Sequence, residues 1–302
     1  MKLTKAQLAI FEKYGIEADP QTGKIRRPDG TWINLPLVDG NAKIGKGAYH
    51  FSILPGNFEY TLNIALTVKE SISKKSGKPV KTVCIDDENP EIITVMGTCV
   101  CSCEGCYAQT GNYNYRTTLA YLAIRTITAR FYLAFLETAI KAQIEAFNIE
   151  LIRIHAAGDF FSKEYAQVWR RIAEAFPCVT FWTYTKVKQF ETLFDGLSNA
   201  NIVKSVIDIL GIDGFNYGHC DYIMMCYKVL KAAGFKVHIC FCGIEDYAKI
   251  DTEHCTNCKS CSECDYVLFI EHSTEYKAEE DPLFPELVKM ILSQERSTRK
   301  AA

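Results

Sequence analysis

Four cysteines lie close together at positions 99, 101, 103 and 106. Cys99, Cys103 and Cys106 follow the spacing C-x3-C-x2-C, and three thiolates on one short loop can hold three irons of a [4Fe–4S] cluster. The fourth iron would then be open to bind a small molecule. Zinc is the alternative, because a closed zinc site needs four ligands and Cys101 supplies a fourth. A tetrahedron built from such close cysteines is cramped, so we favour the cluster.

A second run of cysteines occupies positions 255, 258, 261 and 264. Ferredoxin-type runs use this repeated C-x2-C spacing for [4Fe–4S] clusters. The fourth ligand of such a cluster usually comes from farther along the chain, so Cys264 is either the fourth ligand or a spare thiol. Two C-x2-C pairs are also standard zinc ligands, and this interpretation stays open.

The rest of the composition favours a cytoplasmic protein with reduced thiols. The chain has 302 residues, 14 cysteines and a formal net charge of −2. We find no pattern of a signal peptide, and the crowded cysteines cannot pair with one another as a secreted disulfide framework would. The long apolar stretch at 117–147 is interrupted by charges, so we expect no membrane association. A lysine-rich turn at 69–81 gives weak support for a nucleic-acid partner.

Alternating strand and helix patterns predict an α/β fold that positions both cysteine runs. We expect a strand-rich layer over residues 1–90, a partial (β/α) barrel over 91–242, and a cysteine-rich appendage with a C-terminal helix over 243–302. Strands are predicted at 59–69, 80–85, 91–97, 151–156, 179–185, 201–208 and 236–242, and helices at 3–14, 117–147, 163–175, 187–197 and 221–233.

Several polar motifs follow these strands directly. The first cysteine run follows the strand at 91–97, Gly158 and Asp159 follow the next strand, and Thr185 ends the third. In parallel α/β folds, ligands gather at the carboxyl ends of the strands, so we expect these motifs to share one rim. His155 ends a buried strand, where we expect a core histidine with a hydrogen-bond partner.

The C-x3-C-x2-C loop after a strand resembles the cysteine motif of radical S-adenosylmethionine enzymes. The resemblance implies that the open iron binds S-adenosylmethionine and that an electron from the cluster releases a 5′-deoxyadenosyl radical. Gly158 and Asp159 stand where that family has a glycine-rich acidic motif for the amino group of the cofactor. Tyr184, Thr185 and Ser205 lie at strand positions where such barrels contact the cofactor. Gly105 departs from the family, which often has an aromatic residue before the last cysteine.

A second resemblance covers more of the chain, from about residue 41 to residue 261. Residues 41–45, 51–56, 106–108, 154–165 and 181–186 are similar to an uncharacterised phage family, the "gene product eighty-eight" proteins. Compared with that family, this chain carries an inserted hairpin at 59–86. The family also has a cysteine near position 242, which makes Cys242 a candidate ligand of an auxiliary cluster with Cys255, Cys258 and Cys261.

Together these patterns predict a radical S-adenosylmethionine-type enzyme with a catalytic and an auxiliary [4Fe–4S] cluster. Such an enzyme implies an electron donor, such as a flavodoxin or ferredoxin, and a substrate that the sequence does not identify. The alternative is a phage or mobile-element binding protein stapled by zinc or a cluster, without catalytic activity. An electron carrier is a third interpretation, although ferredoxins need far less chain.

Overall fold

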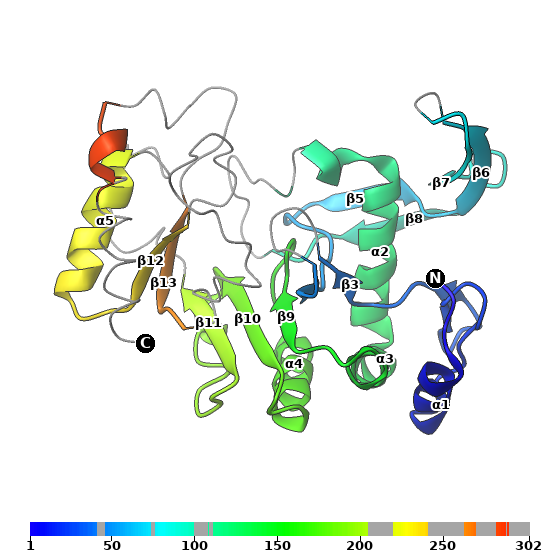
Figure 1. Cartoon of the computed structure of the whole chain (residues 1–302), viewed down its shortest axis with the longest axis horizontal. Coiled ribbons are helices and arrows are strands. Elements are labelled where there is room, and N and C mark those ends of the chain that lie inside the picture. The colour runs from blue at the N-terminus through cyan, green and yellow to red at the C-terminus, as the bar shows by residue number, and fades with distance from the viewer. Residues whose placement is uncertain are drawn as a thin grey trace.

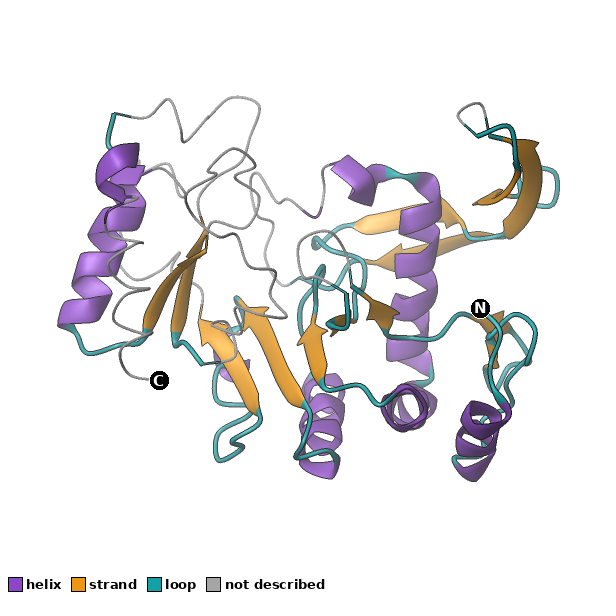
Figure 2. Ribbon diagram, viewed as in Figure 1, coloured by secondary structure: helices purple, strands orange, loops and turns teal. Residues whose placement is uncertain are grey.

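Seven strands form one sheet in the part of the chain that the structure describes. The structure is a computed structural model that describes residues 1–40, 46–73, 76–99, 108, 111–204, 220–240, 263–269, 282–287 and 289. The strands are β3 (Val38–Asp39), β4 (Tyr49–His50), β9 (Leu151–Ile154), β10 (Thr180–Thr185), β11 (Ala200–Lys204), β12 (Val237–Cys240) and β13 (Tyr266–Phe269). Their order is β12-β13-β11-β10-β9-β4-β3 (Figures 1 and 2). Every neighbouring pair from β12 to β4 is parallel, and β3 pairs antiparallel with β4.

This main sheet draws strands from all three regions that the sequence suggested. β3 and β4 come from the first 90 residues, and β13 comes from the cysteine-rich C-terminal region but lies between β11 and β12. The chain is therefore a mixed α/β protein, and the seven strands of the main sheet form an open sheet. The partial barrel stays a prediction.

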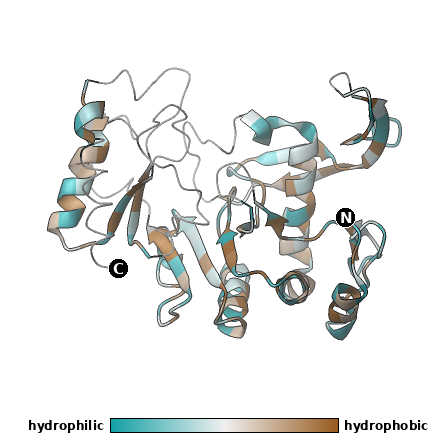
Figure 3. Cartoon of the chain, viewed as in Figure 1, coloured by the Kyte–Doolittle hydropathy of each residue, from teal (hydrophilic) through white to brown (hydrophobic). Residues whose placement is uncertain are grey.

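Two helices cover one face of the main sheet. The described residues include the α-helices α1 (Lys5–Lys13), α2 (Arg116–Phe131), α3 (Leu133–Phe147), α4 (Lys163–Ala175) and α5 (Cys220–Ala232). Successive strand residues point to opposite faces. Ile152, Phe181 and Ile202 pack with α3 and α4 in the largest core cluster. Their neighbours Leu151, Trp182 and Val203 form a separate cluster with Ala48 and Val267, which defines the far face of the sheet. In Figure 3, brown hydrophobic segments alternate with paler or teal segments along the strands of the sheet.

An extended segment continues β4 along β9 to its carboxyl end. The Phe51 amide donates to the Arg153 carbonyl at 3.1 Å, and the Ile53 amide donates to the Ala157 carbonyl at 3.1 Å. Phe51, Ile53 and Leu54 are fully buried. Because these bonds follow a parallel ladder, residues 51–54 carry the chain to the rim where β9 ends.

The strand predicted at 91–97 is wrong in its placement. It forms β8 (Ile92–Met96), which pairs antiparallel with β5 (Glu59–Asn63) in a separate two-stranded sheet, and Ile92 and Met96 are exposed. The parallel strand that leads to the rim beside β9 is β4 with its extension. A strand's neighbours depend on tertiary packing, which the apolar run at 91–97 does not encode.

The strand predicted at 59–69 is divided in two at Asn63. The Asn63 side chain donates to the Asp86 carbonyl at 2.8 Å and accepts from the Ala65 and Glu91 amides, both at 3.0 Å. β6 (Leu66–Ile72) then leaves β5 and pairs with β7 (Pro79–Ile85), the return strand that the sequence predicted. Figure 1 shows this hairpin standing away from the main sheet, as suits an insertion.

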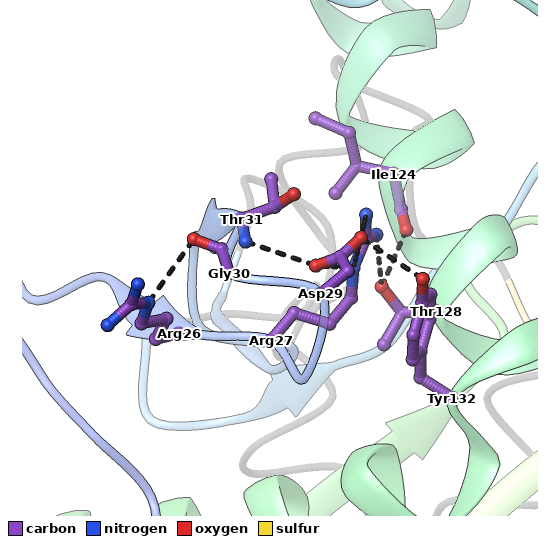
Figure 4. Close-up of polar contacts among 8 residues, drawn as sticks. All are labelled: Arg26, Arg27, Asp29, Gly30, Thr31, Ile124, Thr128 and Tyr132. Atoms are coloured by element: carbon purple, nitrogen blue, oxygen red, sulfur yellow. Dashed lines mark hydrogen bonds and ion pairs between the residues drawn. The ribbon is translucent and has the colours of Figure 1, made fainter.

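The helix predicted at 117–147 is broken at Tyr132 into α2 and α3, which bend by 116°. A turn between the short strands β1 (Ile25–Arg26) and β2 (Trp32–Ile33) packs against the break (Figure 4). The Arg27 guanidinium lies 4.6 Å from the centre of the Tyr132 ring, and the Tyr132 hydroxyl donates to Asp29 at 3.1 Å.

Within the described ranges, no single helix is long and apolar enough to cross a membrane. The bent α2–α3 pair passes the same test of length and apolar composition when its two helices are joined.

Other predicted elements are confirmed with small changes at their ends. The helices at 3–14, 163–175 and 221–233 correspond to α1, α4 and α5.

The helix predicted at 187–197 is wrong, because only the three-residue 3-10 helix η3 (Lys188–Phe190) forms there, followed by turns. The Arg170 side chain of α4 donates to the Leu193 carbonyl at 2.6 Å and to the Asp195 carbonyl at 3.3 Å. These side-chain bonds satisfy carbonyls that a helix would otherwise pair internally.

Candidate functional site

The first cysteine run begins at the rim, immediately after a buried threonine. The Thr98 amide and hydroxyl both donate to the Leu54 carbonyl, at 3.0 and 2.7 Å. The Cys99 amide donates to the Gly56 carbonyl at 2.9 Å, and the Cys99 side chain is half-buried. The extension of β4 therefore fixes the backbone of Cys99, and no feature of the sequence marked Thr98 for this role.

Gly158 and Asp159 contact the same threonine from the end of β9. The Asp159 amide donates to Thr98 Oγ1 at 3.2 Å. Gly158 has a backbone φ of +85°, and a Cβ there would lie 2.6 Å from Thr98 Oγ1 and 2.5 Å from Ile53 Cγ1. A side chain at this position would push the two segments apart, so glycine is required by both conformation and space. The structure thus places Cys99 beside the Gly158–Asp159 motif.

The Asp159 carboxylate joins the carboxyl ends of β9 and β10. Its Oδ1 atom accepts from the Thr185 hydroxyl at 2.8 Å and the Phe160 amide at 2.7 Å, and its Oδ2 atom accepts from the Lys186 amide at 3.0 Å. Burial raises the pKa of Asp159, while these three hydrogen bonds act to lower it. Each carboxylate oxygen can accept two hydrogen bonds, and Oδ2 accepts one from the described residues, so it can take one more donor.

Tyr184 and Thr185 point to opposite faces of β10. The Thr185 hydroxyl is buried between Asp159 and the Val187 amide, from which it accepts at 3.0 Å. Tyr184 packs against the far-face cluster, and the Arg153 guanidinium lies 5.2 Å from the centre of its ring. Thr185 therefore positions Asp159, whereas Tyr184 lies on the far face of the sheet.

Cys264 belongs to the end of the second cysteine run. It is half-buried and packs against the far-face cluster, and its carbonyl accepts from Asn201 Nδ2 at 2.9 Å. Because β13 follows directly, the second run ends on the main sheet. The other predicted site residues lie outside the described residues: Cys101, Cys103, Cys106, Ser205, Cys242, Cys255, Cys258 and Cys261. Within the described ranges, no three metal-ligating side chains gather at one point.

His155 is a buried histidine at the end of β9, as expected. Its Nε2 atom lies 2.7 Å from the Tyr165 hydroxyl, and its ring packs edge-on against Phe160. Burial lowers the pKa of His155 to about 3, with a smaller contribution from Arg153. The backbone φ is +59°, a left-handed conformation that only a minority of non-glycine residues adopt. His155 turns the chain from β9 toward Gly158.

Comparison with known proteins places the chain in a family. The sequence profile of the family described as "Gene product 88" matches residues 37–272, which is more than half of the chain. The chain belongs to the Gene product 88 family. The resemblance to this phage family is therefore confirmed, and the matched span is slightly wider than the sequence motifs indicated.

Two phage proteins are similar over a short stretch. The Gene 88 proteins of Mycobacterium phages D29 and L5 are each 49% identical to this chain over 39 residues. That stretch is 13% of the chain and 16% of each relative, so the chain spans about one sixth of their length. No solved structure matches. The names of these relatives state no activity.

Proposed function

We propose that this Gene product 88 protein is a radical S-adenosylmethionine-type iron–sulfur enzyme. One observation carries the proposal: Thr98 holds the first cysteine of the C-x3-C-x2-C run against Gly158 and Asp159 at the carboxyl ends of parallel strands. Ligands of parallel α/β folds bind at this edge. An acidic residue and the first cysteine of the run at one rim are two features that such an enzyme would use.

The residues at the rim suit the proposed groups. Cys99 is a half-buried thiol on a backbone held by hydrogen bonds, and thiolates are the usual ligands of iron–sulfur clusters. With Cys103 and Cys106, it would hold a [4Fe–4S] cluster, which supplies the electron that cleaves S-adenosylmethionine to the 5′-deoxyadenosyl radical. The spare acceptor capacity of Asp159 Oδ2 would take the ammonium of S-adenosylmethionine by a charge-assisted hydrogen bond. Gly158 lets the end of β9 lie close to Thr98 and Ile53.

The proposal also includes an auxiliary cluster and an electron donor. Cys242, Cys255, Cys258 and Cys261 would hold an auxiliary cluster, with Cys264 as the alternative fourth ligand. Cys264 packs on the far face of the main sheet. A cytoplasmic flavodoxin or ferredoxin would supply the electron.

The proposal is tested by anaerobic reconstitution with iron and sulfide, followed by dithionite and S-adenosylmethionine. We expect 5′-deoxyadenosine from the wild-type protein, and none from Cys103→Ala. Cys178→Ala is the matched control, because Cys178 is an exposed thiol outside both cysteine runs and should not affect the product. A well-reconstituted wild-type protein that yields no 5′-deoxyadenosine would contradict the proposal. Colourless, zinc-loaded protein from anaerobic purification would favour a zinc-stapled binding protein instead.

A further inference from the structure

Three side chains that can carry positive charge approach one another where β4, β9 and α2 meet. His50 and Arg153 are paired neighbours on the adjacent parallel strands β4 and β9, so their side chains share the far face of the sheet. Arg125 comes from α2, which is fixed beside the extension of β4 because the Leu54 amide donates to Thr126 Oγ1 at 2.9 Å. We call His50, Arg125 and Arg153 the basic triad.

The basic triad is set among groups that can hold a polar ligand. His50 Nδ1 lies 3.2 Å from Ser52 Oγ, and Arg153 lies over the Tyr184 ring at 5.2 Å. Burial, together with the smaller effects of the positive charges on Arg125 and Arg153, lowers the pKa of His50 to about 4. The imidazole is therefore neutral near pH 7 and offers an N–H group or a nitrogen lone pair beside two guanidinium groups.

Arg125 has no counter-charge among the described residues. It makes no ion pair there, in contrast to Arg116 of the same helix, which pairs with Asp87. Burial lowers the pKa of Arg125 to about 10. A desolvated cation raises the free energy of the folded state, and a bound anion would offset this cost.

We propose that the basic triad binds an anionic group of a ligand, a phosphate or a carboxylate, on the far face of the sheet. Planar guanidinium groups bind both kinds of oxyanion through paired hydrogen bonds. The inference goes beyond the iron–sulfur chemistry and does not depend on it, since anion binding needs no cluster.

Thermal unfolding in inorganic phosphate, in succinate and in chloride at equal ionic strength tests the proposal. We expect phosphate or succinate to raise the Tm of the wild-type protein relative to chloride. The anion that acts at the lower concentration identifies the ligand group as phosphate or carboxylate. Arg125→Gln should bind that anion about ten-fold more weakly or worse, because it loses a charge-assisted hydrogen bond worth about 1.5–3 kcal/mol.

Arg116→Gln is the matched control, because Arg116 is exposed at the start of the same helix. This variant should keep the full effect of the anion. In chloride, Arg125→Gln should be at least as stable as the wild-type protein, since it removes a desolvated cation. Equal anion effects on the wild-type protein and Arg125→Gln, or no effect on the wild-type protein, would overturn the proposal.

A second measurement uses the wild-type protein alone and does not require Arg125→Gln to fold. The ring signals of His50 in NMR spectra report its pKa as pH is varied. A bound anion should raise this pKa from about 4 toward the ordinary value of histidine. A His50 pKa that is the same in chloride and in saturating phosphate or succinate would contradict anion binding at the triad.

Discussion

The start of the first cysteine run is held in position by contacts among Thr98, Gly158 and Asp159. The Thr98 hydroxyl donates to the extension of β4 and accepts from the end of β9, so one small side chain joins two segments far apart in sequence. Gly158 and Asp159 were foreseeable as a site because they follow a predicted strand. Thr98 was not, because a buried threonine next to a cysteine has no distinctive pattern and its partners are set by packing.

Gly158→Ala should destabilise the protein more than the same change at another left-handed glycine. Gly196 is the matched control, because its φ is +83° and a Cβ there would meet nothing within 4 Å. We expect Gly196→Ala to cost about 1–2 kcal/mol from backbone conformation. Gly158→Ala should cost about 1–3 kcal/mol more, because its Cβ would overlap Thr98 and Ile53. Urea unfolding measures both, and equal costs would show that the contact with Thr98 is not tight.

His155 should make stability depend on pH. The unfolded chain binds a proton at His155 near pH 6.5, whereas the folded chain does so only near pH 3. The unfolded state therefore binds more protons between these values, and stability falls as pH falls through this window. Asparagine tolerates the left-handed backbone conformation. His155→Asn should therefore reduce the slope of the unfolding free energy against pH by the amount that corresponds to about one bound proton. His50 and His238, whose pKa values are lowered to about 4, would leave a residual slope. An unchanged slope in His155→Asn would contradict this prediction.

At the scale of elements, periodicity identified most helices and strands but not their partners. The amphipathic pattern at 163–175 corresponds to α4, and its buried positions face the core. The apolar run at 91–97 gave a correct strand with the wrong neighbour, since β8 pairs with β5. The break at Tyr132 was missed because the apolar pattern continues through it. Contacts from the N-terminal turn, rather than a proline or glycine, accompany that break.

Arg27→Ala should weaken the packing of the N-terminal turn on α2 and α3. The Arg27 side chain is 10% exposed, pairs with Asp29 at 2.6 Å and lies over the Tyr132 ring. Loss of these contacts should cost about 1–3 kcal/mol of unfolding free energy. Arg26→Ala is the matched control: Arg26 pairs with Glu17 but is 48% exposed, so its loss should cost about 0.5 kcal/mol or less. Similar costs for the two variants would show that the turn is not held through Arg27.

At the scale of the whole molecule, the sequence predicted the α/β class and the family but not the course of the sheet. β13 lies between β11 and β12, and the first parallel strand beside β9 is β4, not β8. The intervening β5–β8 region separates β4 from the cysteine run in sequence, yet Thr98 returns to Leu54 in space. Such long-range pairing depends on packing that local patterns do not encode. The basic triad was missed for the same reason, because its members come from three separate elements.

In the proposed function, the first cysteine run holds a cluster whose open iron binds S-adenosylmethionine beside Asp159. The most direct measurement is the electron paramagnetic resonance spectrum of the reconstituted, dithionite-reduced protein before and after adding S-adenosylmethionine. We predict a reduced-cluster signal that changes shape when the wild-type protein binds the cofactor, and a smaller change at the same cofactor concentration in Asp159→Asn. A wild-type protein with a reduced cluster whose spectrum is identical with and without S-adenosylmethionine would contradict the account.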